Sequence, residues 1–290
     1  MQISVIVPCY NAEKTLGETL SSLAEQVWDR EWEVIIADNR STDQSLKVAE
    51  SFSNKIRNLR IVDASARQGT PCAINKGVEV ALGDSVVFCD ADDVPAPGWL
   101  AAMGEALNQH TFVACRMDYE KLNNRQVVDA HGKFQIEGLA KLDYPPYLYH
   151  AGGGTLGVKR SVFLDVRGYD PDLIYLHDTD FCLKVQLAGH ALVFVKEAVN
   201  HIRFRSDLTG TFRQARNWAE YNVLLSKRYG DHGAPAPDRW RRLINETWRA
   251  VMLLRHYRRA SYGARFRTLW RWGWTLGKWR GVVKYRVPPF

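Results

Sequence analysis

Short apolar runs alternate with amphipathic segments over the first ninety residues. Four such runs predict strands, at 3–7, 33–37, 59–62 and 85–89. The segments between them carry apolar residues at helical spacing and predict helices, at about 11–27, 41–56 and 73–81. We expect Asn11 to cap the first helix, and Ser41 with Gln44 to cap the second. Strands that alternate with helices through short loops predict an α/β fold with parallel strands and right-handed crossovers.

Polar clusters follow three of these strands directly, at 8–11, 38–41 and 90–93. The carboxyl ends of parallel strands meet at one edge of a sheet, so we expect these clusters to lie together there. Asp90, Asp92 and Asp93 would repel one another unless a cation neutralises them, and hard oxygen ligands suit Mg²⁺ or Mn²⁺. A solvated Asp-rich turn is the alternative. The position at the end of an apolar strand, opposite two other polar loops, favours a cation site.

A run of glycines at 152–157 formally fits the dinucleotide-binding pattern Gly-x-Gly-x-x-Gly. The run does not follow a clean apolar strand, so an oxidoreductase of the Rossmann type is not favoured. These glycines instead suit a close approach of the backbone to a substrate. We expect helices to follow at 158–166 and at 211–229.

The charge of the chain is divided unevenly between a body and a tail. The 290 residues are 46% hydrophobic and 24% charged, as in ordinary globular proteins, with a formal net charge of +7. Residues 1–230 carry −4, whereas residues 231–290 carry +11 and six of the ten tryptophans. The break at 230–237 is rich in Gly and Pro and indicates a linker.

Several classes of protein are excluded by simple features. No apolar run approaches the ~20 residues of a membrane span, and the first residues lack the basic stretch of a signal peptide. The five cysteines are odd in number and contain no Cys-x-x-Cys pair. We therefore expect reduced, buried thiols, as in a cytosolic protein, and no structural zinc site.

The ordered motifs resemble those of family 2 glycosyltransferases. The similarity covers about residues 3–230 and lies in five segments, at 5–11, 37–43, 69–77, 90–93 and 151–170. It implies a GT-A fold, which is an α/β fold with a mixed, mainly parallel sheet flanked by helices, here with a C-terminal helical extension. We expect a catalytic domain over 1–230, with a nucleotide-binding half at 1–93 and an acceptor-binding half at 94–230, followed by a basic helical tail at 231–290.

The resemblance also implies an activity and a donor site. Such enzymes transfer a hexose from a nucleotide-diphosphate donor to an acceptor hydroxyl with inversion. The residues that would bind the donor nucleotide are Pro8, Tyr10, Asp38, Arg67 and Asp90. Asp38 would accept a hydrogen bond from a uracil N–H, which favours UDP. Asp92 and His201 would ligate Mn²⁺ or Mg²⁺, although a lone histidine is as often a buried structural residue. Asp93 would lie behind the metal ligands without binding the metal itself, or would cap a turn or helix.

The acceptor side is implied to lie further along the chain. Asp178 aligns with the general base that removes the acceptor proton. His177 stands where the family usually carries Glu. Gly153, Gly154 and Asp180 are placed at the sugar and acceptor side, with helix capping as the alternative for both Asp178 and Asp180. Arg203 and Arg205 are weaker candidates for a phosphate contact, because a solvated basic strand edge explains them equally well.

The sequence of the tail predicts a cationic amphipathic helix that is capped by Asp238 and carries tryptophans on one side. Trp and Arg together suit the headgroup region of a membrane, so we expect residues 238–286 to bind a membrane surface. Packing on the body, a homodimer formed through the tail, and nucleic-acid binding are the alternatives. The acidic body argues against nucleic acid. The expected protein is thus cytoplasmic, peripheral on the inner face of the cell membrane, and acts on a glycan or lipid-linked acceptor in polysaccharide synthesis.

Overall fold

The computed structural model describes residues 1–131, 133–204, 207–255 and 257–290. The chain divides into two compact units. The first comprises Met1–Lys121, Phe134–Ala140 and Tyr149–Arg203, and the second comprises Leu122–Lys133, Lys141–Leu148 and Phe204–Phe290. The second unit thus includes the helix at Leu208–Arg228, which precedes the expected start of the tail at residue 231.

The first unit is built on a mixed sheet. Among the described residues, its eight strands follow the order β3-β2-β1-β4-β9-β6-β10-β5. The strands are β1 (Ile3–Cys9), β2 (Trp32–Asp38), β3 (Leu59–Asp63), β4 (Ser85–Phe88), β5 (Val94–Pro95), β6 (Phe112–Asp118), β9 (Leu156–Lys159) and β10 (Leu192–His201). β9 runs antiparallel to β4 and β6, and β5 runs antiparallel to β10, whereas the other pairs are parallel. The predicted mixed, mainly parallel sheet is confirmed. Two short strands, β7 (Ala140–Lys141) and β8 (Tyr149–His150), form a separate pair.

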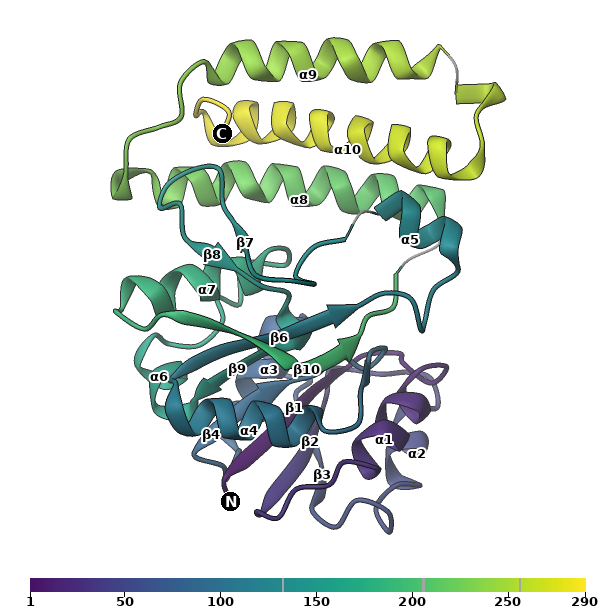
Figure 1. The fold of residues 1–290 in the computed structure, drawn as a ribbon, viewed down its shortest axis with the longest axis vertical. Coiled ribbons are helices and arrows are strands. Elements are labelled where there is room, and N and C mark those ends of the chain that lie inside the picture. The colour runs from purple at the N-terminus through teal and green to yellow at the C-terminus, as the bar shows by residue number, and fades with distance from the viewer. Residues whose placement is uncertain (132, 205–206, 256) are drawn as a thin grey trace. The chain divides into compact units, whose positions relative to one another are not determined.

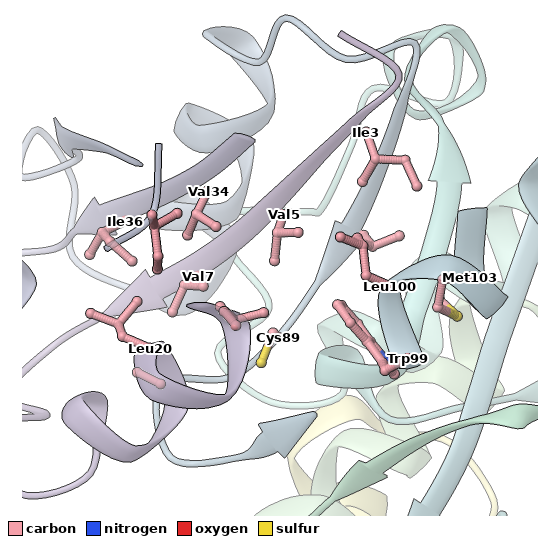
Figure 2. Packing of buried hydrophobic residues seen from close by; sticks show 14 of the residues in the cluster. Ile3, Val5, Val7, Leu20, Val34, Ile36, Cys89, Trp99, Leu100 and Met103 are labelled. Atoms are coloured by element: carbon pink, nitrogen blue, oxygen red, sulfur yellow. The ribbon is translucent and has the colours of Figure 1, made fainter. Parts of the chain in front are cut away.

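Helices cover both faces of this sheet because its strands are apolar on both sides (Figure 1). They are α1 (Leu16–Ala24), α2 (Ser45–Glu50), α3 (Thr70–Glu79), α4 (Trp99–Gln109), α6 (Arg160–Asp165) and α7 (His177–Leu187). Val5 and Val7 of β1 pack with residues of α1, α2 and α4, as Figure 2 shows for Leu20 and Trp99. Ile6, which points to the other face, packs with residues of α3, α6 and α7. Successive side chains of a strand point to opposite faces, which produces this division.

The four predicted N-terminal strands are present, but the predicted helix caps are wrong. α1 begins at Leu16, well after Asn11, and α2 begins at Ser45. Oδ1 of Asn11 accepts a hydrogen bond from the Thr42 amide (2.8 Å), and Oγ of Ser41 accepts one from the Asn11 amide (3.1 Å). Both side chains therefore join the loop after β1 to the loop after β2. The sheet brings these loops together, and the bonds between loops replace local capping.

Two further expectations about helices are also wrong. The segment predicted as a helix at 158–166 begins with β9, in which Val158 is fully buried, and α6 starts only at Arg160. Val27, expected on the apolar side of the first helix, lies beyond α1 and is 83% exposed. A run of a few apolar residues fits either a strand or a helix, and pairing with β4 and β6 decides for the strand.

The second unit is helical. Its helices are α5 (Arg125–His131), α8 (Leu208–Arg228), α9 (Arg239–Leu254) and α10 (Tyr262–Tyr285), with short 3₁₀ turns at Gly230–His232 and Tyr257–Arg259. Figure 1 shows α10 running beside both α8 and α9. Glu220 of α8 is buried and pairs with Arg280 (3.2 Å) and Lys284 (2.7 Å) of α10. α9 begins directly after Asp238, as expected, but the Asp238 side chain accepts no capping hydrogen bond there. No helix in the described part of the chain is long and apolar enough to cross a membrane.

Candidate active site

The loops after β1, β2 and β4 lie at one edge of the sheet, as predicted. β1 runs parallel to both β2 and β4, with Cys9 opposite Asp38 and Ile6 opposite Phe88. Pro8 is part of β1, and Tyr10 follows it with half of its surface exposed. Thr15 Oγ1 donates to the carbonyl oxygen of Ala91 at 3.0 Å, which joins the first of these loops to the third. The three polar clusters therefore share one edge.

Asp38, at the end of β2, offers a buried acceptor. Its Oδ2 accepts a hydrogen bond from the Ser41 amide at 3.3 Å. Its Oδ1 is buried and accepts no hydrogen bond from any described residue. A buried carboxylate oxygen without a donor is costly, so this atom suits an N–H group supplied by a ligand. The arrangement fits the expected contact with a nucleobase.

The loop that carries Arg67 is held next to Asp38 by hydrogen bonds to its backbone. The side-chain amide of Asn39 donates to the carbonyl oxygens of Ala64 and Arg67, which fixes the loop after β3 against the end of β2. The Arg67 guanidinium, however, pairs with Asp172 at 2.5 Å. Both side chains are largely exposed, so this ion pair is weak enough for a ligand to displace.

The carboxylates after β4 differ in their surroundings. Burial, followed by the charges of Asp92 and Asp178, raises the pKa of Asp90 to about 7. Burial, followed by the charges of Asp90 and Asp92, raises the pKa of Asp93 well above its usual value, and Oδ1 of Asp93 accepts a hydrogen bond from the Arg203 amide at 3.0 Å. Asp92 is exposed. Asp93 is thus a buried support for the loop, while Asp92 faces solvent, where it could hold a cation.

His201 is oriented by a carboxylate. It is the last residue of β10, opposite Val94 of β5 and Asp118 of β6. Nδ1 of His201 lies 2.6 Å from Oδ2 of Asp118. Partial burial acts to raise the pKa of Asp118, but hydrogen bonds from His201 and from backbone amides outweigh it and lower that pKa.

This pairing bears on a metal site. Histidines that bind metals commonly use one ring nitrogen for the metal and the other for a carboxylate, and here Nε2 is the remaining nitrogen. Within the described ranges, no three His, Cys, Asp or Glu side chains come together as a ligand set. A carboxylate oxygen of Asp92 and Nε2 of His201 are ligand types that suit Mn²⁺ or Mg²⁺, and a bound diphosphate would supply further oxygen ligands. The expectation for Asp92 and His201 stays a prediction.

A glycine turn lies between the Asp90 carboxylate and Asp178. This turn is the 3₁₀ segment Gly153–Thr155. The Gly153 amide donates to Oδ2 of Asp178 at 3.1 Å. A methyl group on Gly154 would lie 2.8 Å from Oδ2 of Asp90, and the carbonyl oxygen of Gly154 accepts a hydrogen bond from Asn200 at 3.0 Å. The turn thus brings the predicted donor-side and acceptor-side carboxylates to neighbouring positions.

Gln135 supports this turn and was not found from the sequence. The side chain is buried; its Nε2 donates to the Cys115 carbonyl oxygen and to Thr155 Oγ1, both at 2.7 Å, and its Oε1 accepts from the Gly152 amide at 3.0 Å. A glutamine inside a polar loop carries no periodic signal. Asp118 was missed as well, although an aspartate at the end of an apolar segment is a signal that could have found it.

The start of α7 presents Asp178 between two histidines. Oδ1 of Asp178 accepts a hydrogen bond from the Thr179 amide at 2.8 Å. Burial lowers the pKa of His177 and of His150, and the charge of Asp178 opposes this effect in both. The His177 ring lies edge-on to Tyr169, with centroids 5.4 Å apart. Both histidines are therefore held neutral near Asp178, and His150 is a third residue that the sequence did not reveal.

Asp180 and Arg203 are engaged by the protein itself. Asp180 is fully buried, with Oδ2 at 3.8 Å from Nζ of Lys184, one turn later in α7. This position favours the structural alternative for Asp180. The Arg203 guanidinium pairs with Glu18 at 2.6 Å and donates to the Asp92 carbonyl oxygen at 3.1 Å, so Arg203 joins α1 to the acidic loop. Arg205 lies outside the described residues.

The segments that carry the carboxylates after β2 and β4 and the glycine turn lie within a match to a known family. The family model described as Glycosyl transferase family 2 matches residues 4–166, which is more than half of the chain. The chain belongs to this family. The match covers the sheet edge with Asp38 and Asp90, together with the glycine turn.

Curated relatives and solved structures agree with this membership. The poly(ribitol-phosphate) β-N-acetylglucosaminyltransferase TarS of Staphylococcus aureus is 35% identical over 129 residues, 44% of this chain and 22% of TarS. The UDP-Glc:α-D-GlcNAc-diphosphoundecaprenol β-1,3-glucosyltransferase WfgD of Escherichia coli is 29% identical over 183 residues, 62% of this chain and 67% of WfgD. The mannosyltransferase PcManGT of Pyrobaculum calidifontis, in complex with GDP-Man and Mn²⁺, superimposes with a TM-score of 0.67 and 20% identity over 98% of this chain and 87% of PcManGT. The likeness to solved structures shows the GT-A fold. The sequence match to TarS spans about a fifth of the length of TarS.

Proposed function

We propose that this protein is an inverting glycosyltransferase that moves a sugar from a UDP-sugar to a hydroxyl of a glycan or lipid-linked acceptor. The observation that carries the proposal is the glycine turn with a carboxylate on each side. The Gly153 amide donates to the Asp178 carboxylate, and a methyl group on Gly154 would lie 2.8 Å from Oδ2 of Asp90. A donor sugar placed over this turn would have the leaving group on one side and a base on the other.

Asp178 is proposed as the base. As the acceptor oxygen bonds to the anomeric carbon, its proton passes to an Asp178 oxygen, and the bond from that carbon to the diphosphate breaks. Attack opposite the leaving group inverts the anomeric centre. The Gly153 and Thr179 amides hold the carboxylate in place, at 3.1 and 2.8 Å. His150 and His177 beside it are held neutral by burial, so neither places a positive charge against the carboxylate.

The donor is proposed to bind along the shared edge of β1, β2 and β4. Asp38 Oδ1 would accept the N–H of uracil, with Pro8 and Tyr10 beside the base. Asp90 would bind ribose hydroxyls, and Asp92 with His201 would hold the cation. A bound Mn²⁺ or Mg²⁺ would stabilise the charge on the departing diphosphate. The name of WfgD includes UDP-Glc, which supports UDP, whereas PcManGT was solved with GDP-Man. The names of TarS and WfgD support glycan or lipid-linked acceptors.

The test is a donor panel on the full chain. Release of nucleoside diphosphate from UDP-, GDP- and TDP-sugars is measured with Mn²⁺, with Mg²⁺ and with a chelator. We expect turnover of a UDP-sugar that needs the cation and that Asp92→Asn lowers by at least about tenfold. Asp84→Asn, an exposed carboxylate elsewhere in the first unit, is the matched control and should keep wild-type turnover. A panel in which no donor turns over would refute the transferase assignment.

A further inference from the structure

The outward side of α9 carries an apolar strip that no described part of the chain covers. Leu243 and Ala250 are the buried residues of the helix. The strip consists of residues at helical spacing that remain exposed: Trp240 (46%), Ile244 (49%), Trp248 (61%) and Val251 (38%). Exposed tryptophans are uncommon in proteins, and two on one helix face, with aliphatic residues between them, indicate a surface that binds a partner.

The strip continues onto α10. The Trp279 ring lies 6.1 Å from the Trp240 ring, and Trp279 Nε1 donates to Thr247 Oγ1 at 3.0 Å. Trp240 and Thr247 are seven residues apart and so lie on one side of α9. Val283, one turn after Trp279, is 75% exposed and lines a shallow surface hollow with Trp279, Arg280 and Lys284. The two helices therefore form one surface, which we name the Trp–Arg face.

Positive charge accompanies this face. Four arginines of α9 and its end are exposed, at 241, 242, 249 and 255. The single acidic residue of α9, Glu246, pairs with Lys278 of α10. The α10 sequence contains six basic residues and no acidic one. Arg241, three residues before Ile244, and Arg255, four residues after Val251, lie beside the strip, so an anionic partner would meet positive charge there.

We propose that the Trp–Arg face binds the surface of an anionic lipid bilayer, with Trp240, Ile244, Trp248 and Val251 inserted among the headgroups. Arginines beside an apolar strip match a helix that lies in the membrane interface, with its cations at the lipid phosphates. Tryptophan is suited to this depth because its ring is apolar and its N–H is polar. The inference goes beyond the transfer reaction, since it rests on the second unit alone.

Other occupants fit this surface less well. Nucleic-acid bases stack on flat aromatic rings, but Ile244, Val251 and Val283 offer them nothing to stack on, whereas these side chains gain from burial in hydrocarbon. A second copy of the chain, docked symmetrically, would bring the arginines of both copies together and would be repelled.

The experiment is flotation of the full chain with vesicles. We expect the protein to float with vesicles of phosphatidylcholine mixed with phosphatidylglycerol, and far less with phosphatidylcholine alone. Ile244→Ser with Trp248→Ser should lower the partition coefficient by about tenfold. Arg241→Gln with Arg255→Gln, which removes the two charges beside the strip, should reduce the preference for the anionic vesicles. Val27→Ser and Leu82→Ser, which remove apolar side chains that are 83% and 61% exposed in the first unit, are matched controls and should bind as the wild type does.

The outcomes separate the occupants. Circular dichroism melts of each variant establish that loss of binding does not come from unfolding, and the changed side chains are exposed. No flotation of the wild type, or equal flotation of the Ile244→Ser/Trp248→Ser variant and its controls, overturns the proposal. So does a dimer in light scattering that this variant converts to monomer, or tight binding of a homopolymer RNA without vesicle binding. The assay contains no sugar donor, so a failed transferase panel leaves its result unaffected.

Discussion

Nδ1 of His201 lies 2.6 Å from Oδ2 of Asp118, across the neighbouring ends of β10 and β6. This bond fixes the ring and leaves Nε2 as the nitrogen available to a cation. If His201 is a metal ligand, Asp118→Asn should raise the Mn²⁺ concentration for half-maximal turnover by about tenfold, with a smaller change at saturating Mn²⁺. A Mn²⁺ titration of nucleotide release measures this, with Asp84→Asn as control. An unchanged half-saturation point would argue that the pair is only structural.

Asp178→Asn tests the base. The amide keeps the size of the side chain and can still accept from the Gly153 amide, but it cannot take the acceptor proton. We expect kcat for transfer to fall by about 10²–10⁴-fold, while the Kd of the donor changes little. Initial-rate transfer assays give kcat, and calorimetric titration with UDP gives the affinity for the donor nucleotide. A variant that transfers sugar at the wild-type rate would show that Asp178 only caps α7.

Gly154→Ala and Gly153→Ala form a matched pair. A methyl group on Gly154 would lie 2.8 Å from Oδ2 and 3.1 Å from the backbone nitrogen of Asp90, so the turn or the Asp90 carboxylate must move. The methyl group of Gly153→Ala would make only an ordinary contact, 3.4 Å from Asp178 Cβ. We expect kcat/KM for the donor to fall by at least about tenfold in Gly154→Ala and much less in Gly153→Ala. Equal effects would mean that the space beside Asp90 is not what the glycine provides.

The helices of the second unit depend on a close approach of α8 and α10. A methyl group on Gly277 would lie 2.1 Å from the Arg216 carbonyl oxygen, so α8 and α10 would have to separate. We expect Gly277→Ala to lower the free energy of unfolding by about 1–3 kcal/mol. Gly263→Ala, in the same helix, meets only the Arg267 side chain at 3.6 Å and should stabilise slightly, because alanine is the better helix former. Urea denaturation of both variants measures the difference, and similar stabilities would contradict it.

His131 should make the stability of the protein depend on pH. Its ring lies among Phe204, Phe266 and Trp270, and burial lowers its pKa to about 4. An unfolded histidine titrates near 6.5. The unfolded state therefore binds the proton first as the pH falls, and stability is lost between about 6.5 and 4.

His131→Phe removes this effect while keeping a ring in place. Between pH 7 and pH 4.5, the free energy of unfolding of the variant should rise by about 1–2 kcal/mol relative to that of the wild type. The amount is reduced because solvent reaches part of the His131 ring. Urea denaturation at both pH values measures the gain. His150 and His177 act in the same direction but are present in both proteins, so they cancel in the comparison. An identical pH dependence in the two proteins would contradict the prediction.

The sequence by itself determined the sheet and the edge where the chemistry gathers. β-branched runs that end in Pro8, Asp38 and Asp90 are buried on both faces, and such strands pair in parallel through helices. The parallel arrangement then requires their ends to meet. The apolar side of α9 was equally visible, because Trp240, Leu243, Ile244, Trp248, Val251 and Leu254 recur at helical spacing, whereas the structure decided that Leu243 is buried and the others are exposed.

Tertiary structure alone decided the partners of individual side chains. Asn11 and Ser41 join two loops, where local sequence predicted helix caps, because pairing of β1 with β2 brings those loops together. Asp118 and Gln135 reach His201 and the glycine turn from positions 83 and about 20 residues away in the chain. Val158 became a strand residue because β4 and β6 offered it unpaired backbone groups on both sides. Local patterns record which faces must be buried, but hydrogen bonds between distant segments form only when the fold brings them within reach.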